Sequence, residues 1–223
     1  MNSRRLAFYD FDGTLASGDV VDQYLWYVRR GKNPWRLARL IWRARELKRA
    51  DRQSRELFNR LFYSEYRGWP EAWLRGEAKN FFERYLRPHL HEGVELLLEG
   101  NRNQGFVNVL VTGGLDFAMA PVCDRLGFDQ VCANRLEFEG GQATGRLLPP
   151  VLAGASKVEA MLDLCRRYNV EPMSCRAYSD DIADLPMLEA VGEPFATNPK
   201  PELKRIAEQN GWMVLAPPFG RRA

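Results

Sequence analysis

The chain has 223 residues, of which 45% are hydrophobic and 27% charged, a composition typical of a folded globular protein. No apolar run reaches the length of about 18 residues that a membrane-spanning helix needs, so that class of protein is excluded. The apolar run near the start is short and interrupted by aspartates, which argues against a signal peptide, and we expect a cytoplasmic protein. A chain of this length forms one large domain, or one domain with an insert.

The net charge of +3 is unevenly distributed along the chain. Residues 16–90 contain 17 Lys and Arg against 9 Asp and Glu, a net charge of +8, and the rest of the chain carries −5. A basic segment inside a mildly acidic chain indicates an insert with an anionic partner.

The first predicted element is a buried strand at residues 6–12, where an apolar run leads into the motif DFDGT, which begins at Asp10. Asp10 and Asp12 would lie together at the end of this strand, and two like charges there cost free energy unless a partner neutralises them. A calcium loop would need a third acidic ligand and a distal Glu. An ordinary acidic turn is the other interpretation that the motif alone allows.

Residues 16–88 differ in character from the rest, because they contain helical, aromatic and basic stretches and no convincing strand. We interpret them as a helical cap inserted into a core formed by residues 1–15 and 89–223, and we expect the cap to move relative to the core. Two histidines, His89 and His91, follow the cap. A zinc site would need more ligands nearby, so we interpret this pair as a polar junction.

One helix of the cap is predicted over residues 34–49, since Asn33 and Pro34 are typical of an N-cap and a first helical residue. Its arginines cover one face and its apolar side chains the other. The residues that share the apolar face are Leu37, Leu40, Ile41, Ala44 and Leu47.

The core shows alternating strand and helix patterns. After the first strand, apolar runs predict strands at residues 106–114, 175–181, 193–198 and 212–216. Helices are predicted at residues 92–105, 115–127 and 156–170, and Ser156 and Glu159 fit a capping box. Residues 136–148 predict a hairpin with Gly140 and Gly141 at its turn. The alternation predicts an α/β fold with a doubly wound, mostly parallel, Rossmann-like sheet, in which ligands bind beyond the carboxyl ends of the strands.

Three further motifs fall at these strand ends and helix starts. Thr112 stands in VTGG, Lys157 begins a helix, and the segment YSDDIADLPML contains Asp180, Asp181 and Asp184. Together with DFDGT, in this order and spacing, they resemble the four motifs of the haloacid dehalogenase (HAD) superfamily of phosphatases. The resemblance covers essentially the whole core and implies a Mg²⁺-dependent phosphomonoester hydrolase.

The resemblance also implies roles for the acidic residues. Asp10 is the expected nucleophile, which forms an aspartyl-phosphate, and Asp12 is the expected general acid and base. The carboxylates of Asp10 and Asp180 and the backbone carbonyl of Asp12 are the expected Mg²⁺ ligands, because Mg²⁺ prefers oxygen donors. This cation would offset the repulsion between the two carboxylates at the end of the first strand.

The resemblance implies that the remaining motif residues bind the phosphate or support the residues that do. The expected phosphate-binding groups are the Thr112 hydroxyl and the backbone of Gly113 and Gly114, at a helix start that favours anions. Lys157 is expected to hold the nucleophile and the phosphate together. The supporting residues are Thr14, Asp181, which binds Mg²⁺ through water, and Asp184, which orients either Lys157 or such a water.

Within the superfamily, residues 111–146 look like the phosphoserine-phosphatase-like branch, subfamily IB. That branch usually has a Glu nine residues after the nucleophile to meet the substrate amine, and this chain has Asp19 there. An arginine for the substrate carboxylate has no clear counterpart, and Arg55 and Arg60 are candidates. We therefore expect a small, amine-bearing substrate of the phosphoserine, histidinol phosphate or phosphocholine type.

Other functions stay open at this point. Related phosphatases act on phosphatidylglycerophosphate at the membrane, and the helix at residues 34–49, with Trp35 and Trp42, has the character of an interfacial helix. We favour packing of its apolar face within the cap over contact with a membrane surface. A phosphomutase or phosphotransferase would use the same two aspartates. No nucleic-acid-binding motif is recognised, so a small-molecule partner is favoured over nucleic acid.

Overall fold

Seven strands form a single sheet in the computed structural model, which describes residues 5–220. They are β1 (Arg5–Tyr9), β2 (Phe106–Leu115), β3 (Gln130–Glu139), β4 (Gln142–Leu148), β5 (Arg176–Ser179), β6 (Glu193–Thr197) and β7 (Met213–Leu215). The spatial order is β4-β3-β2-β1-β5-β6-β7, and neighbours are parallel except for the antiparallel β3–β4 pair. The predicted α/β fold with a mostly parallel sheet is confirmed.

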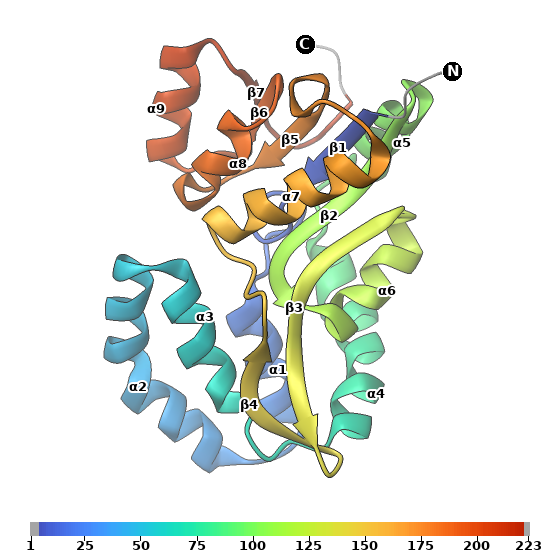
Figure 1. Ribbon diagram of the computed structural model, residues 1–223. Coiled ribbons are helices and arrows are strands. Elements are labelled where there is room, and N and C mark those ends of the chain that lie inside the picture. Colours follow the sequence, from blue (N-terminus) through green and yellow to red (C-terminus); the bar gives the residue numbers. More distant parts are fainter. Residues whose placement is uncertain (1–4, 221–223) are drawn as a thin grey trace.

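Helices connect the strands and pack against both faces of the sheet (Figure 1). They are α5 (Val94–Asn103), α6 (Asp116–Leu126), α7 (Ala155–Tyr168), η4 (Pro172–Ser174), η5 (Ile182–Asp184), α8 (Leu185–Glu189) and α9 (Pro201–Asn210).

The central strand β1 is buried on both of its faces, which explains its nearly continuous apolar sequence. Leu6 and Phe8 belong to one hydrophobic cluster, with side chains of α7, α8 and α9. Ala7 and Tyr9 belong to a second cluster, with side chains of α5 and α6. Alternate residues of a strand point to opposite faces, so β1 joins two cores and carries its carboxyl end between them.

Between residues 20 and 89 the chain forms a series of helices joined by short turns, and we call residues 16–88 the helical insert. It contains α1 (Val20–Arg30), α2 (Pro34–Gln53), α3 (Arg55–Tyr63), η1 (Ser64–Tyr66), α4 (Glu71–Phe81), η2 (Phe82–Leu86) and η3 (Arg87–His89). As predicted, a helix begins at Pro34 with Asn33 as its N-cap, although the Asn33 side chain makes no capping bond.

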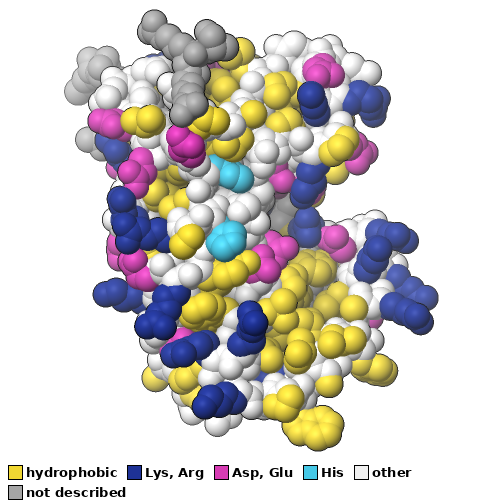
Figure 2. Space-filling model, turned by 180° about the vertical axis from the view of Figure 1, so that it is seen from behind, with side chains coloured by type: hydrophobic (Ala, Val, Ile, Leu, Met, Phe, Trp, Pro, Cys, Tyr) yellow, Lys and Arg dark blue, Asp and Glu magenta, His cyan; other side chains and the backbone are white. Residues whose placement is uncertain are grey.

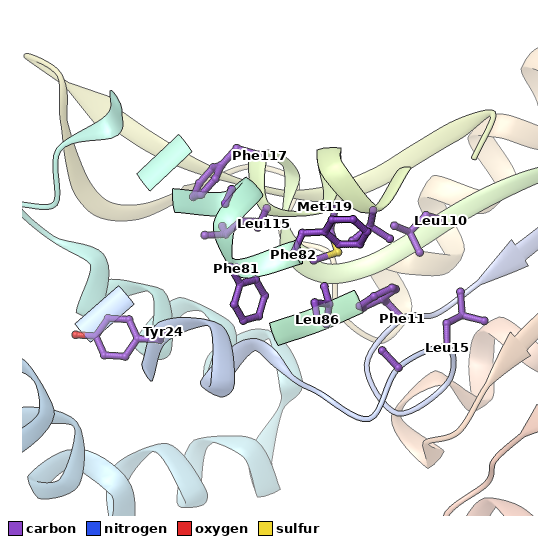
Figure 3. Close-up of a cluster of buried hydrophobic side chains, with 14 of the residues drawn as sticks. Phe11, Leu15, Tyr24, Phe81, Phe82, Leu86, Leu110, Leu115, Phe117 and Met119 are labelled. Carbon is purple, nitrogen blue, oxygen red and sulfur yellow. The ribbon is translucent and has the colours of Figure 1, made fainter. Parts of the chain in front are cut away.

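The insert shares a hydrophobic core with the sheet instead of standing apart from it. Phe82 and Leu86 at the end of the insert are buried, and they lie close to Phe11, Leu115 and Met119 (Figure 3). This packing attaches one end of the insert to β2 and α6.

The β3–β4 hairpin makes a second attachment, and Figure 1 shows it running from the sheet along the insert. The backbone of Ala143 exchanges hydrogen bonds with Gly68 and Trp69, and the Glu71 N–H donates to the carbonyl of Gly141. The turn at Gly140 and Gly141 is as predicted, and both residues have positive φ, which suits this tight turn. The strand β3 begins six residues before the predicted hairpin, at Gln130, because its first half pairs with β2 and shows no alternating pattern.

The predicted apolar face of α2 is only partly buried. Leu40 and Leu47 are buried, but Ala44 is exposed and the exposed fractions of Leu37 and Ile41 are 39% and 67%. The reason is electrostatic. Glu65 is fully buried, and the side chains of Arg39 and Arg43 pair with it, so α2 turns part of its arginine-bearing face inward.

We predict that Phe82→Ala lowers the free energy of unfolding by about 3–5 kcal/mol, because it leaves a cavity where the insert meets the sheet. Urea unfolding measures this loss. Five of the six tryptophans lie in the insert, so tryptophan fluorescence follows the insert while circular dichroism follows the whole chain. The two transitions should coincide. Leu96→Ala, at a side chain 59% exposed, is the control and should change stability by less than about 0.5 kcal/mol. A loss below about 1 kcal/mol in Phe82→Ala would contradict the shared core.

Candidate active site

The carboxyl ends of β1, β2 and β5 meet where the chain order of the sheet changes direction. The strand β1 lies between β2 and β5, so the connections from its neighbours leave on opposite sides. Asp10 follows β1 and Asp180 follows β5, while Gly113 lies near the end of β2. Such a switch point is the usual ligand site of an open α/β sheet.

Lys157 lies between two carboxylates at this point. Its Nζ donates to Asp10 Oδ1 at 2.6 Å and to Asp184 Oδ2 at 2.8 Å, and all three side chains are buried. The Ser179 hydroxyl donates to the same oxygen of Asp184 at 2.9 Å. Asp184 is therefore in a position to orient Lys157, which was one of its two expected roles.

The helix that carries Lys157 begins differently from the prediction. The N-cap of α7 is Gly154, not Ser156, so the expected capping box between Ser156 and Glu159 is wrong. Ser156 lies inside the first turn, where its hydroxyl donates to the carbonyl of Val151 and accepts the N–H of Ala153. The sequence pattern was misleading because this serine bonds to the loop before the helix.

Thr14 and Gly13 hold the two carboxylates face to face. The Thr14 hydroxyl lies 3.3 Å from Asp10 Oδ2 and 3.1 Å from Asp180 Oδ1, within hydrogen-bonding distance of both. Gly13 has φ +84°, and a Cβ at this position would lie 2.3 Å from Asp180 Oδ2. Only glycine combines this backbone conformation with so close an approach of the carboxylate.

The predicted magnesium ligands fit a hard cation in their chemistry. Asp10 and Asp180 supply two carboxylates and Asp12 a carbonyl, and Mg²⁺ typically binds one or two carboxylates and keeps several waters. Within residues 5–220, no three His, Cys, Asp or Glu side chains are grouped as metal ligands. A set of two carboxylates and one carbonyl does not need a third such side chain.

Burial raises the pKa of both aspartates of DFDGT. The pKa of Asp10 rises to about 6, with Asp184 and Asp180 adding to the effect of burial and Lys157 opposing it. Asp12 has its pKa raised well above its usual range, by burial first and then by Asp10 and Asp19. Asp12 therefore keeps a proton to higher pH than an ordinary carboxyl, as a general acid must.

Lys157 stays protonated in this setting. Burial disfavours its charged form, but Asp10 and Asp184 outweigh burial and raise its pKa.

A cavity of about 300 Å³ opens between the helical insert and the sheet, and Figure 2 shows a hollow between these two halves of the molecule. The sheet side contributes Asp10, Asp12 and Lys157, and the insert contributes Asp19 and Arg55. The candidate catalytic residues and charged groups of the insert thus face the same space.

The phosphate-binding residues predicted in VTGG differ in their positions. Gly113 lines the cavity, while Thr112 is 1% exposed and its hydroxyl accepts the Gly114 N–H at 2.9 Å. The carbonyl of Gly113 accepts hydrogen bonds from Tyr63 and Asn134, both at 2.8 Å. The backbone of Gly113 therefore reaches the cavity. The hydroxyl of Thr112 instead forms a hydrogen bond within the same loop.

Asp19 combines two features that the sequence presented as alternatives. It is the N-cap of α1, and its Oδ1 accepts the N–H groups of Val21 at 2.8 Å and Asp22 at 3.0 Å. Asp19 also lines the cavity, and its side chain is exposed. Within residues 5–220, its second oxygen, Oδ2, has no hydrogen-bond partner and is available to a ligand.

Of the two arginines considered for a substrate carboxylate, Arg55 lines the cavity. It pairs with Asp51 at 2.8 Å and lies 3.8 Å from Asp181 Oδ2. Arg60 pairs instead with Glu56 on the surface.

Lys200 also lines the cavity, and sequence reasoning missed it. Its Nζ pairs with Asp181 and lies 3.3 Å from Asp180 Oδ2. Asp181 further accepts the N–H of Ala183 at 2.8 Å. The sequence signal that could have identified Lys200 is its position two residues after the strand predicted at residues 193–198, at the same edge of the sheet as the aspartates.

The two histidines lie where the insert joins the core. His89 Nδ1 is 2.6 Å from the Tyr85 carbonyl, and its ring stacks on that of Tyr85. His91 Nε2 is 3.4 Å from the Gly13 carbonyl, which also accepts a hydrogen bond from Asn198 at 2.9 Å. His91 therefore supports the loop that carries Gly13.

The profile of the haloacid dehalogenase-like hydrolase family matches residues 7–189. The chain belongs to this family. It is 26% identical to a phosphoserine phosphatase of Archaeoglobus fulgidus over 92% of this chain and 56% of the relative. It is 24% identical to a histidinol-phosphatase of Neisseria meningitidis over 95% of this chain and 98% of the relative.

The fold of this family member is that of phosphoserine phosphatase. A solved apo structure of that enzyme matches with a TM-score of 0.71 and 24% identity, over 95% of this chain and 93% of that chain. The chain spans between 52% and 60% of the length of the first three curated relatives. Within residues 5–220, no helix has the length and hydrophobicity to span a membrane.

We predict that Lys157→Met lowers the free energy of unfolding by about 3–5 kcal/mol at about pH 8, because it leaves Asp10 and Asp184 buried without a cation. The loss should shrink at about pH 5. Lys157 now lowers the pKa of Asp10, so its removal raises that pKa further above about 6, and protonation at low pH then relieves the repulsion.

Urea unfolding at both pH values measures this difference. Lys204→Met, at an exposed lysine on α9, is the matched control and should have little effect at either pH. A loss in Lys157→Met that is equal at both pH values would contradict the electrostatic explanation.

Proposed function

We propose that this protein is a Mg²⁺-dependent phosphomonoester hydrolase that works through an aspartyl-phosphate on Asp10 and acts on a small, amine-bearing phosphate. The observation that carries the proposal is the buried Asp10–Lys157–Asp184 cluster that lines the cavity, with the Thr14 hydroxyl between Asp10 and Asp180. Removing two carboxylates and the lysine between them from water costs free energy, and such buried charged groups in a cavity are typical of functional sites.

In this proposal, Asp10, Asp180 and the backbone carbonyl of Asp12 would hold the magnesium ion. When bound, the ion neutralises carboxylate and phosphate charge and makes the phosphorus easier to attack. Gly13 leaves the space that Asp180 occupies beside the DFDGT loop. Thr14 keeps the two carboxylates at a fixed separation.

In the first step, an oxygen of Asp10 attacks phosphorus, and the bond between phosphorus and the ester oxygen breaks. Asp12 gives its proton to the departing alcohol, which its raised pKa allows. In the second step, Asp12 takes a proton from a water that attacks the phosphorus. The bond to Asp10 then breaks and inorganic phosphate leaves.

Lys157 and Gly113 act on the charge that moves in these steps. The protonated Lys157 offsets negative charge on Asp10 and on the transferred phosphoryl group. The backbone of Gly113 lines the same cavity and supports a phosphoryl oxygen there.

The charged groups of the insert support the substrate class. Asp19 presents a free carboxylate oxygen to the cavity, and a substrate amine would complement it. Arg55 lines the same cavity and suits a substrate carboxylate, which favours phosphoserine among the three expected types. The relatives named phosphoserine phosphatase and histidinol-phosphatase both have amine-bearing substrates in their names.

We predict that Asp10→Asn abolishes Mg²⁺-dependent release of inorganic phosphate from small phosphomonoesters, because the amide cannot form the aspartyl-phosphate. Excess chelator should have the same effect on the unmodified protein. Asp163→Asn, at a partly exposed aspartate on α7 that does not line the cavity, is the control and should keep full activity. Turnover by Asp10→Asn, or ester transfer without free phosphate in the unmodified protein, would overturn the hydrolase mechanism.

We predict that Asp19→Asn lowers kcat/KM about 2- to 5-fold for phosphoserine and phosphocholine and much less for glycerol phosphate, since exposed charge pairs contribute up to about 1 kcal/mol. Asparagine caps helices as well as aspartate, so this change removes the charge and keeps the start of α1. Unchanged kcat/KM for all three substrates would assign Asp19 to the helix cap alone, and an equal loss for all three would contradict a role in recognising the amine.

A further inference from the structure

Two tryptophans of α2 have no packing role in the described structure. The exposed fractions of Trp35 and Trp42 are both 82%, and Ile41 between them is 67% exposed. Seven residues make about two helical turns, so the two indoles project from the same side of α2. By contrast, Trp69 and Trp73 stack on each other within the insert. Such exposed, aligned aromatic residues mark an interaction surface.

Cations without partners stand on the same side of the helix. Arg45 and Arg49 follow Trp42 by three and seven residues, positions that lie along one face of an α-helix. Lys48 and Arg52 flank this row. All four side chains are exposed, and within residues 5–220 none of them has an ion pair or hydrogen bond.

The other basic residues of α2 are used inside the insert. Arg39 and Arg43 pair with the buried Glu65, and Arg36 donates to the carbonyls of Glu65 and Arg67. The helix therefore has two basic sides with different roles. One holds the insert together, and the other presents positive charge and indole rings to the solvent.

A groove continues this surface towards α3. It has a volume of about 710 Å³, and Trp42, Arg45 and Arg49 line it together with Leu57 and Leu61 of α3. Figure 1 places α2 at the outer edge of the insert, away from the sheet, so nothing in the described chain covers this side. We call the outward side chains Trp35, Ile41, Trp42, Arg45, Lys48, Arg49 and Arg52 the α2 surface.

We propose that the α2 surface docks on an anionic lipid bilayer. Indole rings are favoured at the level of the lipid headgroups, and Ile41 adds an aliphatic side chain for the acyl boundary. The four free cations complement anionic headgroups. The proposal goes beyond the proposed phosphatase function and does not depend on it, because the surface lies outside the catalytic cavity and its binding needs no phosphate ester.

A second copy of the chain suits this surface less well. A two-fold dimer would place the same patch of each copy against the other. Arg45 and Arg49 would then face the identical charges of their counterparts, and Glu46, the acidic residue that lines the groove beside them, is already paired with Arg43. A single-stranded nucleic acid would use the cations and stack on the indoles, but it would leave Ile41 without a role.

The test uses the full chain and sedimentation with two kinds of vesicles, phosphatidylcholine alone and phosphatidylcholine mixed with phosphatidylglycerol. We expect binding to the anionic vesicles, weakening with added salt, and little binding to the zwitterionic ones. Tryptophan emission should shift to shorter wavelength on binding. Lipids brominated in their acyl chains should quench it in the unmodified protein, which gives a readout that requires no variant.

Two double variants and a control separate the contributions. Arg45→Gln with Arg49→Gln should weaken binding to anionic vesicles about 25-fold, at about fivefold for each cation. Trp35→Ala with Trp42→Ala should weaken it about tenfold or more. Lys204→Gln with Arg205→Gln, an equal loss of charge on α9, should leave it unchanged. The melting temperatures of all variants should match the unmodified protein, since these side chains are exposed.

Several results would overturn the proposal. Equal binding by the α2 variants and the α9 control would do so, and so would absence of both sedimentation and quenching with anionic vesicles. Sedimentation equilibrium that shows a dimer dispersed by the Trp35→Ala and Trp42→Ala changes would assign the surface to contact between copies. Tighter binding of a single-stranded oligonucleotide than of anionic vesicles would assign it to nucleic acid.

Discussion

The ion pairs that Lys157 makes with Asp10 and Asp184 are the interaction on which the site depends. They join the end of β1, the first turn of α7 and the segment after β5, which are far apart in the sequence. Three charged groups with almost no solvent exposure are stable only if their attraction and hydrogen bonds outweigh the loss of hydration. The parallel order of β2, β1 and β5 makes these contacts possible, because it brings the carboxyl ends of the strands together and with them the charged side chains.

Much of the fold could be predicted from the sequence, because buried parallel strands and amphipathic helices have distinct patterns. The parts that could not be predicted depend on distant contacts. The first half of β3 pairs with β2 and lacks alternation. The orientation of α2 follows from Glu65, whose full burial with Arg39 and Arg43 is invisible in a local pattern that treats arginine as a surface residue. In α2, ion pairs with a distant residue determine which face is buried, and hydrophobic periodicity does not.

The same distinction holds in the candidate site. The spacing of Asp10, Asp12, Lys157 and Asp180 was informative because each follows a strand or begins a helix. The direction of the Thr112 hydroxyl could not be predicted from spacing, since it depends on the hydrogen bond that this hydroxyl accepts from the Gly114 N–H. Arg55 and Lys200 reach the cavity through the placement of α3 and of the loop after β6, which sequence spacing alone does not determine.

The continuous course of β3 has a mechanical consequence. Its first half belongs to the sheet, and its second half forms the hairpin that is bonded to the insert through Ala143. Between these halves lies Asn134, whose side chain donates to the carbonyl of Gly113 and accepts the N–H of Leu152. A tilt of the insert would bend β3 near Asn134, beside the loop that faces the cavity. A change in the position of the insert helices would therefore change the shape of the Gly113 loop through the backbone of β3.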